Sequence, residues 1–225
     1  MTDLDRPVWA ALAHAPHLAD GGDLARRFRR DVNLFAAARD ASPESLDALA
    51  TLVAPQESVY LLQVDPIRLP GALVAVREAQ GVQMLATRAV EAEAGAEPVV
   101  ELGEVDAPDM LALAQLTEPG PFLPRTHTMG RFIGIRVGGR LAAMAGERMR
   151  FPGFTEVSGV CTHPDFRGRG LARRLSSVVA HGIQQRGEQA FLHAWASNRV
   201  AIDLYERLGF RWRTDVRVAV AQRRA

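Results

Sequence analysis

Residues 167–172, Arg-Gly-Arg-Gly-Leu-Ala, have the types and spacing that best suit a bound anion. The β-branched and apolar segment 154–162 precedes them and predicts a strand that Pro164 ends. Behind them, apolar side chains recur at helical spacing through residue 183. A glycine-rich turn at a helix N-terminus leaves several backbone N–H groups free and adds the positive end of the helix dipole. The pattern therefore predicts a phosphate or pyrophosphate site.

This turn lacks the features of two other phosphate-binding motifs. The Gly-Lys-Ser/Thr ending of a Walker loop is absent. No Asp or Glu closes a second strand about 20 residues further on, as a dinucleotide-binding fingerprint requires. A glycine-rich turn before a helix also occurs without any ligand, so the turn alone leaves a purely structural role open.

The elements around the turn follow the order β-α-β-β-β-α-β-α-β. Strands are predicted over 99–105, 132–137, 141–148, 154–162, 190–194 and 212–220, with helices after Asp106, after the turn and from Asn198. Gly138 and Gly139 predict a two-residue hairpin turn, and Gly209 predicts the end of the last helix. The segment 118–130 is rich in proline and glycine, which predicts a loop.

The turn and a second block, residues 198–210, together resemble the GNAT superfamily of acyl-CoA-dependent N-acyltransferases. The first block carries Arg-x-x-Gly-x-Ala after Val-Cys-Thr-His-Pro, and the second reads Asn-Arg-Val-Ala-Ile-Asp-Leu-Tyr-Glu-Arg-Leu-Gly-Phe. The resemblance covers residues 99–212 and implies an α/β (α+β) fold with a mixed, mostly antiparallel sheet flanked by helices. The family usually ends in two long strands. The last strand is therefore expected to be missing, merged into 212–220, or supplied by residues 1–90 or a partner chain.

The resemblance also implies a site for acetyl-CoA, or another acyl-CoA, as co-substrate. In the family, the amides of the turn hold the CoA pyrophosphate and pantetheine lies along the preceding strand. An asparagine at the start of the last helix contacts pantetheine. Carried to this sequence, the CoA-binding residues are Val160, Cys161, Thr162, Arg167, Gly168, Arg169, Gly170, Leu171, Ala172 and Asn198.

Two residues are expected to carry the chemistry of transfer, which needs a proton removed from the amine and a proton given to the leaving thiolate. Glu156 resembles the general-base glutamate of some family members, and this role needs burial to raise its pKa. Its alternative is an exposed carboxylate on a strand face. Tyr205 resembles the tyrosine that protonates the CoA sulfur. Its alternative is a core aromatic, because it shares a helix face with Ala201 and Leu208.

Other reactive side chains have weaker cases. Cys161 has His163 two residues away on the same strand face, as a nucleophile requires, but the family transfers the acyl group directly. His14 and His17 are spaced for one helix face without an evident third ligand, so no metal is expected. His127 lies in the predicted loop and is a candidate contact for the acceptor, with a solvated loop histidine as the alternative.

Residues 1–90 predict a smaller accessory α/β domain, and the segment 91–98 predicts a linker to a catalytic domain, 99–225. Within the accessory domain, helices are predicted at 7–18, at 43–53 after a Ser42 N-cap, and at 73–79, and strands at 32–38, 58–64 and 82–88. The basic run 26–30 predicts an exposed helix end. A degenerate domain before a catalytic one resembles the glycine N-acyltransferase-like branch of the superfamily.

The composition is that of an ordinary globular protein. The 225 residues are 48% hydrophobic and 24% charged, and the net charge of +1 gives no strong attraction to nucleic acid or to a membrane surface. All 27 basic residues are arginine. The single cysteine excludes an internal disulfide and fits a reducing compartment. Neither a signal peptide nor a membrane-spanning run is recognised, so a cytoplasmic protein is expected.

Together these features predict an N-acyltransferase, most simply an N-acetyltransferase. It is expected to move the acyl group directly from acyl-CoA to a primary amine of a small molecule or amino acid. Two alternatives stay open: a protein or peptide N-acetyltransferase, and a non-catalytic acyl-CoA-binding or interaction module. Three roles stay open for the accessory domain: completing the sheet, covering the acceptor, or mediating a homodimer, which is a further expectation.

Overall fold

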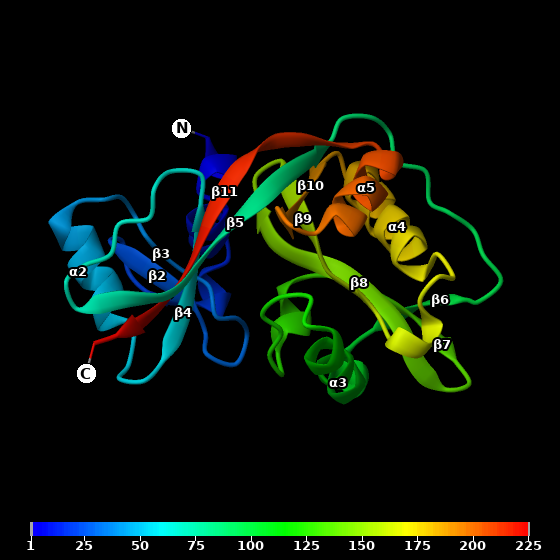
Figure 1. Cartoon of the computed structure of the whole chain (residues 1–225), viewed down its shortest axis with the longest axis horizontal. Helices are drawn as coiled ribbons and strands as arrows, with labels where there is room; N and C mark the ends of the chain where they lie inside the picture. Colours follow the sequence, from blue (N-terminus) through cyan, green and yellow to red (C-terminus); the bar gives the residue numbers. More distant parts are fainter. Residues whose placement is uncertain (1, 225) are drawn as a thin grey trace.

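The described part of the chain, residues 2–224, forms one sheet of eight strands and one of three (Figure 1). This computed structural model builds the large sheet from β4 (Ser58–Gln63), β5 (Leu73–Ala86), β6 (Val99–Leu102), β7 (Phe132–Val137), β8 (Arg140–Phe151), β9 (Phe154–Thr162), β10 (Gln189–Trp195) and β11 (Phe210–Arg223). Their order across the sheet is β4-β11-β5-β10-β9-β8-β7-β6. β9 and β10 pair in parallel, and the other neighbours are antiparallel.

The second half of the chain follows the predicted order of elements. After β6 come α3 (Ala107–Thr117), the hairpin of β7 and β8, then β9, α4 (Leu171–Gln185), β10, α5 (Arg199–Leu208) and β11. β9 has the predicted bounds. The expected mostly antiparallel sheet flanked by helices is therefore confirmed.

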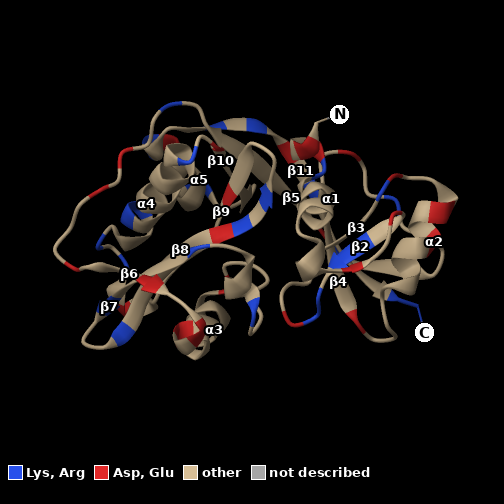
Figure 2. Cartoon of the chain, turned by 180° about the vertical axis from the view of Figure 1, so that it is seen from behind, with Lys and Arg blue, Asp and Glu red and all other residues tan. Residues whose placement is uncertain are grey.

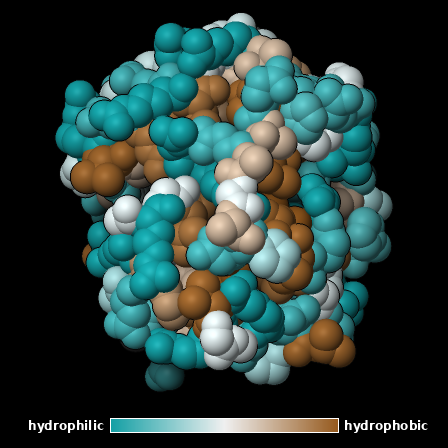
Figure 3. All heavy atoms as spheres, turned by 90° about the vertical axis from the view of Figure 1, so that its right-hand side faces the viewer, coloured by the Kyte–Doolittle hydropathy of each residue, from teal (hydrophilic) through white to brown (hydrophobic). Residues whose placement is uncertain are grey.

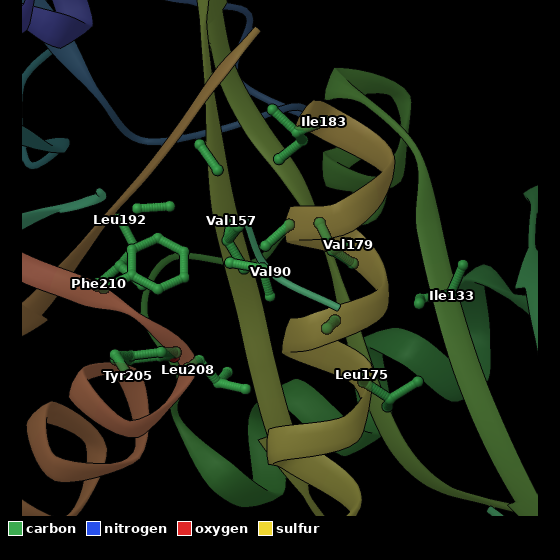
Figure 4. Close-up of a cluster of buried hydrophobic side chains, with 14 of the residues drawn as sticks. Val90, Ile133, Val157, Leu175, Val179, Ile183, Leu192, Tyr205, Leu208 and Phe210 are labelled. Atoms are coloured by element: carbon green, nitrogen blue, oxygen red, sulfur yellow. The ribbon is translucent and has the colours of Figure 1, made fainter. Parts of the chain in front are cut away.

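The helices α4 and α5 cover one face of the sheet beside the site. α4 presents Leu175, Val179 and Ile183 to the sheet, and all three are buried. α5 adds Tyr205 and Leu208 to the same hydrophobic cluster (Figure 4). Burying an aliphatic side chain of this size contributes about 1.5–3 kcal/mol, so this cluster fixes the start of α4, where the glycine-rich turn lies, against β9.

The strand β5 corrects one prediction and answers another. Residues 73–79, predicted as a helix, are the first half of a continuous strand. This strand pairs with β10 on one side and with β11 along nearly its whole length on the other. Its β-branched residues favour a strand once such partners exist, and tertiary pairing overrides local propensity. The missing strand of the fold is thus supplied by residues 1–90, which was one of the expected outcomes.

Residues 2–57 build a small unit at one end of the large sheet (Figure 1). It contains α1 (Pro7–His14), β1 (Ala19–Gly21), β2 (Ala25–Phe28), β3 (Ala36–Ala38) and α2 (Pro43–Thr51). Ser42 caps α2 as predicted, because its side chain accepts a hydrogen bond from the Ser45 amide. The predicted strand 32–38 is shorter, since only its last three residues pair with β2.

The basic run 26–30 is not the predicted exposed helix end. Arg27 lies in β2 and is 1% exposed. Its guanidinium pairs with Glu57 at 2.7 Å and donates to the Leu52 carbonyl. A buried arginine needs such partners, and they come from residues distant in the sequence.

The small unit joins the large sheet through β4. The Tyr60 amide donates to the Leu34 carbonyl, and Phe35 and Tyr60 form an isolated parallel bridge. Residues 1–90 also contribute β4 and β5 themselves to the large sheet. The division into 1–90, 91–98 and 99–225 stays a prediction about domains, and the large sheet extends across it.

The surface carries both signs of charge. Arginines and acidic residues are interspersed over the elements seen in Figure 2, as the net charge of +1 suggests. The face at the β6–β7 end is mainly hydrophilic, with hydrophobic areas scattered among polar ones (Figure 3). Among the helices of residues 2–224, none has the length and apolar character needed to span a membrane.

Candidate active site

One cavity of about 700 Å³ opens where β9 and β10 separate. The two strands pair only from Phe154 to Glu156 on the β9 side, and the cavity lies beyond that point. Ten of the twelve predicted site residues line it: Val160, Cys161, Thr162, Arg167, Gly168, Gly170, Leu171, Ala172, Asn198 and Tyr205. Two do not, Arg169 and Glu156. The sequence blocks that are distant along the chain thus meet at one opening of the sheet.

The glycine-rich turn has the geometry that its sequence predicts. Gly168 and Gly170 have φ angles of 77° and 75°, in the left-handed region that favours glycine. A Cβ built on either residue meets no atom within 4 Å, so the space beside the turn is open. α4 begins directly after Gly170. Free backbone N–H groups at this helix start are well placed for an anion.

Arg169 does not line the cavity as predicted. Its guanidinium stacks on the Phe166 ring, 5.2 Å from the ring centre. Arg140 lies 5.4 Å from the centre of the same ring. Arg169 therefore packs on Phe166 outside the lining of the cavity, and the arginines that line the cavity are Arg148, Arg167 and Arg173.

A bulge shapes β9 beside the cavity. Ser158 pairs with Gly146 and Cys161 with Met144, so two residues of β9, including Gly159, face a single residue of β8. Gly159 has a φ of 63°, and a Cβ there would come 2.9 Å from the Phe132 ring. A bulge interrupts the ladder and leaves backbone groups unpaired, which are available for an extended polar chain such as pantetheine.

Tyr205 places a buried phenol group at the cavity. Its side chain lines the cavity but is only 8% exposed, and burial raises its pKa to about 12. The ring packs edge-on against Phe210, with 5.9 Å between ring centres. The hydroxyl therefore holds its proton throughout the neutral range and can donate it, as a leaving thiolate would require.

Glu156 does not meet the condition for a base. Its carboxylate is fully buried and accepts from Arg148 Nε at 2.8 Å, from Arg148 Nη2 at 2.6 Å, and contacts His193 Nδ1 at 2.7 Å. Burial acts to raise its pKa, but the charge and hydrogen bonds of Arg148, and then of His193, lower it to about 2. The expected raised pKa is therefore wrong, and Glu156 is an ionised partner beneath the cavity.

His193 lies between that carboxylate and the cavity. It was not predicted from the sequence as a site residue. Because the ionised Glu156 only accepts hydrogen bonds, Nδ1 of His193 carries the ring proton and Nε2 holds the lone pair. Nε2 lies 3.0 Å from the Gln83 amide nitrogen, which donates to it. The signal was a histidine in the apolar run 190–194, since a buried polar group needs a partner.

Gln83 is itself held by the N-terminal segment. Its Nε2 donates to the Leu4 carbonyl at 2.8 Å, and its Oε1 accepts from Arg213 at 2.9 Å. Arg213 also pairs with Asp5 at 2.6 Å. The orientation of the His193 ring is therefore set by β5, β11 and the first residues of the chain together.

The remaining reactive side chains do not form sites. Burial raises the pKa of the Cys161 thiol to about 11, so it is protonated and unreactive at neutral pH. His163 contacts Arg140 and the Asp165 amide and forms no hydrogen bond with Cys161. His127 contacts Glu104 at 2.9 Å and does not line the cavity. Residues 2–224 contain no cluster of potential metal ligands.

The small N-terminal unit and β4 complete the cavity on the side away from the turn. Phe35, Tyr60 and Leu62 line it there. The same unit anchors the loop 118–130, since the Thr126 hydroxyl donates to the Val32 carbonyl at 2.6 Å. The segment expected to be accessory is thus a wall of the candidate site.

The glycine-rich turn makes a specific prediction. Gly170→Val should lower affinity for CoA at least about tenfold, because a β-branched residue at positive φ is strained by about 1–3 kcal/mol and its side chain fills the open space beside the turn. Calorimetric titration with CoA measures the change. Gly153→Val is a matched control, with a φ of 77° and open space but no place in the cavity. Equal CoA affinity in the two variants would contradict the assignment.

Comparisons with known proteins agree with this geometry. Residues 132–218 match the family model described as FR47-like protein. A solved structure from Novosphingobium aromaticivorans, assigned to the GNAT family of acetyltransferases, is 42% identical with a TM-score of 0.93, and the match covers 100% of both chains. A GCN5-related N-acetyltransferase from Kribbella flavida matches with a TM-score of 0.67 at 18% identity, covering 100% of this chain and 97% of that one. The latter likeness supports the fold alone.

The chain also matches a curated relative over a short stretch. The mycothiol acetyltransferase of Rhodococcus jostii is 42% identical over 72 residues, which cover 31% of this chain and 24% of the relative. The chain therefore spans about a quarter of the length of that relative. The shared stretch agrees with the acetyltransferase assignment and carries no information on the acceptor.

Proposed function

The chain belongs to the GNAT family of acetyltransferases, and we propose that it transfers the acetyl group of acetyl-CoA directly to a primary amine. The observation that carries this proposal is that one cavity is lined both by the glycine-rich turn and by Tyr205 and His193. The glycine-rich turn suits the CoA pyrophosphate, and Tyr205 and His193 lie further along the same cavity. Acetyl-CoA would act as co-substrate.

The residues that line the cavity have separate tasks in this proposal. Gly168, Gly170 and the start of α4 bind the pyrophosphate. The pantetheine lies along β9 as far as Asn198. The Asn198 side chain caps α5 by accepting a hydrogen bond from the Ala201 amide at 3.1 Å. The thioester then reaches the point between Tyr205 and His193, where the amine attacks.

His193 replaces Glu156 as the proposed base. As the amine attacks, Nε2 takes up one ammonium proton directly or through one water, and the acceptor displaces the Gln83 amide from this atom. The imidazolium that forms is stabilised by the Glu156 carboxylate at Nδ1. Glu156 is thus a positioning residue, kept ionised by Arg148. Tyr205 gives its proton to the CoA sulfur as the carbon–sulfur bond breaks.

Tyr205→Phe should lower kcat by about 10–10³-fold and leave CoA affinity within a few-fold, because the hydroxyl acts only in the transition state. Because burial raises the pKa of Tyr205 to about 12, the tyrosine should not cause an alkaline loss of wild-type activity below about pH 11. Thiol release and CoA titration on one preparation measure both quantities. Equal losses in kcat and affinity would instead make Tyr205 a residue that shapes the pocket.

A thiol-release assay with acetyl-CoA and a panel of amines tests the function. The proposal predicts amine-dependent release that Gly170→Val weakens through KM for acetyl-CoA. A protein that binds acetyl-CoA and releases no thiol with any amine would favour the alternative of a non-catalytic binding module. A protein active on peptides alone would favour the protein or peptide N-acetyltransferase.

Three finer expectations stay predictions. They are membership of the glycine N-acyltransferase-like branch, a cytoplasmic location and a homodimer. A longer acyl-CoA as co-substrate and an amino acid as acceptor also stay open. The same thiol-release assay, run with acyl-CoA substrates of different chain length, tests whether a longer acyl-CoA is used.

A further inference from the structure

The end of the cavity beyond His193 forms an apolar cup, which we define by six residues: Phe35, Tyr60, Leu62, Trp195, Val216 and Val218. They come from the small N-terminal unit and from β4, β10 and β11. Leu62 pairs with Val218 across β4 and β11. Four of the six, all except Tyr60 and Trp195, are less than 9% exposed.

A glycine lies in the middle of the cup. Gly81 of β5 pairs with Trp195 on one side and with Val216 on the other, and it lines the cavity. A Cβ at Gly81 would come 3.1 Å from the Val216 side chain and 3.0 Å from the Ala194 carbonyl. Both contacts are tighter than ordinary van der Waals contact, so the row Trp195–Gly81–Val216 has no room for a larger residue at its centre, and its surface is made by the apolar side chains on either side.

The cup offers no carboxylate to a substrate. Among the described residues that line the whole cavity, Glu118 in the loop is the one acidic side chain, and it is exposed. Glu156 does not line the cavity, and both of its oxygens are taken by Arg148 and His193. A second ammonium group seated in the cup would thus be buried without a partner, which is strongly unfavourable.

The aromatic rings of the cup do not supply a substitute for a carboxylate. The Arg148 guanidinium lies over the Phe35 ring, 4.9 Å from its centre, and Arg77 lies over Trp195 at 5.9 Å. The Phe35 and Trp195 rings thus each have a cation on one face already, and a further cation beside them would be repelled by these guanidinium groups. The third ring, Tyr60, packs edge-on against Phe35 with 5.9 Å between ring centres. An uncharged apolar group has neither penalty and gains from leaving water.

We propose that the acceptor is a monoamine whose body is apolar, aromatic or aliphatic, and that the cup excludes diamines and polyamines. This inference rests on the proposed function and names the substrate class of the same site. The amine reaches His193, where it loses its proton, while its body occupies the cup.

The test compares n-pentylamine with 1,5-diaminopentane, which differ by one terminal ammonium group, and adds 2-phenylethylamine. We expect kcat/KM for pentylamine and 2-phenylethylamine to exceed that for the diamine by at least about tenfold, the scale set by one mismatched polar group. Tyr60→Glu, which adds a carboxylate at a half-buried cup position, should shift this ratio toward the diamine by about tenfold and leave KM for acetyl-CoA unchanged. Tyr60→Phe is the matched control and should keep the wild-type preference.

The outcomes separate the two proposals. Equal or better turnover of the diamine overturns the apolar cup and leaves the proposed acetyl transfer intact. If no amine is turned over, calorimetric titration of the CoA-loaded protein with each amine still tests the apolar cup. Tighter binding of pentylamine than of the diamine then supports the cup although the proposed function fails, and the reverse order or no binding of pentylamine overturns it.

Discussion

Replacing Glu156 with glutamine is expected to lower the free energy of unfolding by about 3–5 kcal/mol, the scale for breaking a buried ion pair. The variant leaves the Arg148 guanidinium, whose side chain is 10% exposed, without its ionised partner. The matched control is Glu101→Gln, which breaks the ion pair of Glu101 with Arg131 at the surface and should cost at most about 1 kcal/mol. Urea unfolding of the three proteins measures the differences.

The difference should also depend on pH in a defined direction. The pKa of Glu156 is lowered from 4.5 to about 2 in the folded protein, so its ionised form stabilises the fold above pH 4.5. This stabilisation is lost as pH falls from 4.5 toward 2, and the gap between wild type and Glu156→Gln should narrow there. The double variant Arg148→Met/Glu156→Gln should recover part of the loss. A gap independent of pH would contradict the ion pair.

The second large effect is expected at His193. His193→Ala should lower kcat/KM by about 10²–10⁴-fold, the range of general acid–base catalysis, with CoA affinity within a few-fold. The loss should lie in the acidic limb of the pH–rate profile, since this limb reports the base. Initial rates across the pH range, with CoA titration on the same protein, measure it.

A variant further along the network separates catalysis from packing. Gln83→Leu leaves His193 and Glu156 in place but removes the amide that donates to Nε2. If His193 is the base, this variant should shift the acidic limb of the profile without abolishing it. Equal activity and an unchanged profile for His193→Ala would contradict the proposed base and favour a relay of water molecules.

The sequence predicted the elements whose signals are local. β9 has its predicted bounds because an apolar β-branched run ends at Pro164. The glycines of the turn adopt the positive φ angles that their type suggests. Ser42 and Asn198 cap their helices because capping depends only on neighbouring amides. Most of the residues predicted to bind CoA line one cavity in the structure.

Three of the errors involve partners from other elements of the fold. Residues 73–79 form a strand because β5 pairs with β10 on one side and with β11 on the other. Arg27 is buried because Glu57 lies across from it. Glu156 was assigned from its position alone, whereas its pKa depends on Arg148 and His193. Long-range pairing of this kind leaves no periodic trace in a single sequence.

The N-terminal segment, residues 2–90, has two of the roles that were left open for it. It supplies β5 to the large sheet, and it contributes Phe35, Tyr60 and Leu62 to the cavity. It also holds the loop 118–130 through Thr126. A chain lacking this segment should therefore lose the acceptor end of the site and not merely an accessory surface.

The most direct test of the account is to follow the acetyl group. The protein is incubated with n-pentylamine and with acetyl-CoA whose acetyl group carries carbon-13. Mass spectrometry then measures the masses of the amine and of the intact protein. The account predicts the label on the amine in an amount equal to the thiol released, and an unmodified protein at every time. Label on the protein that then passes to the amine would contradict direct transfer, and free labelled acetate without acetylated amine would contradict the proposed function.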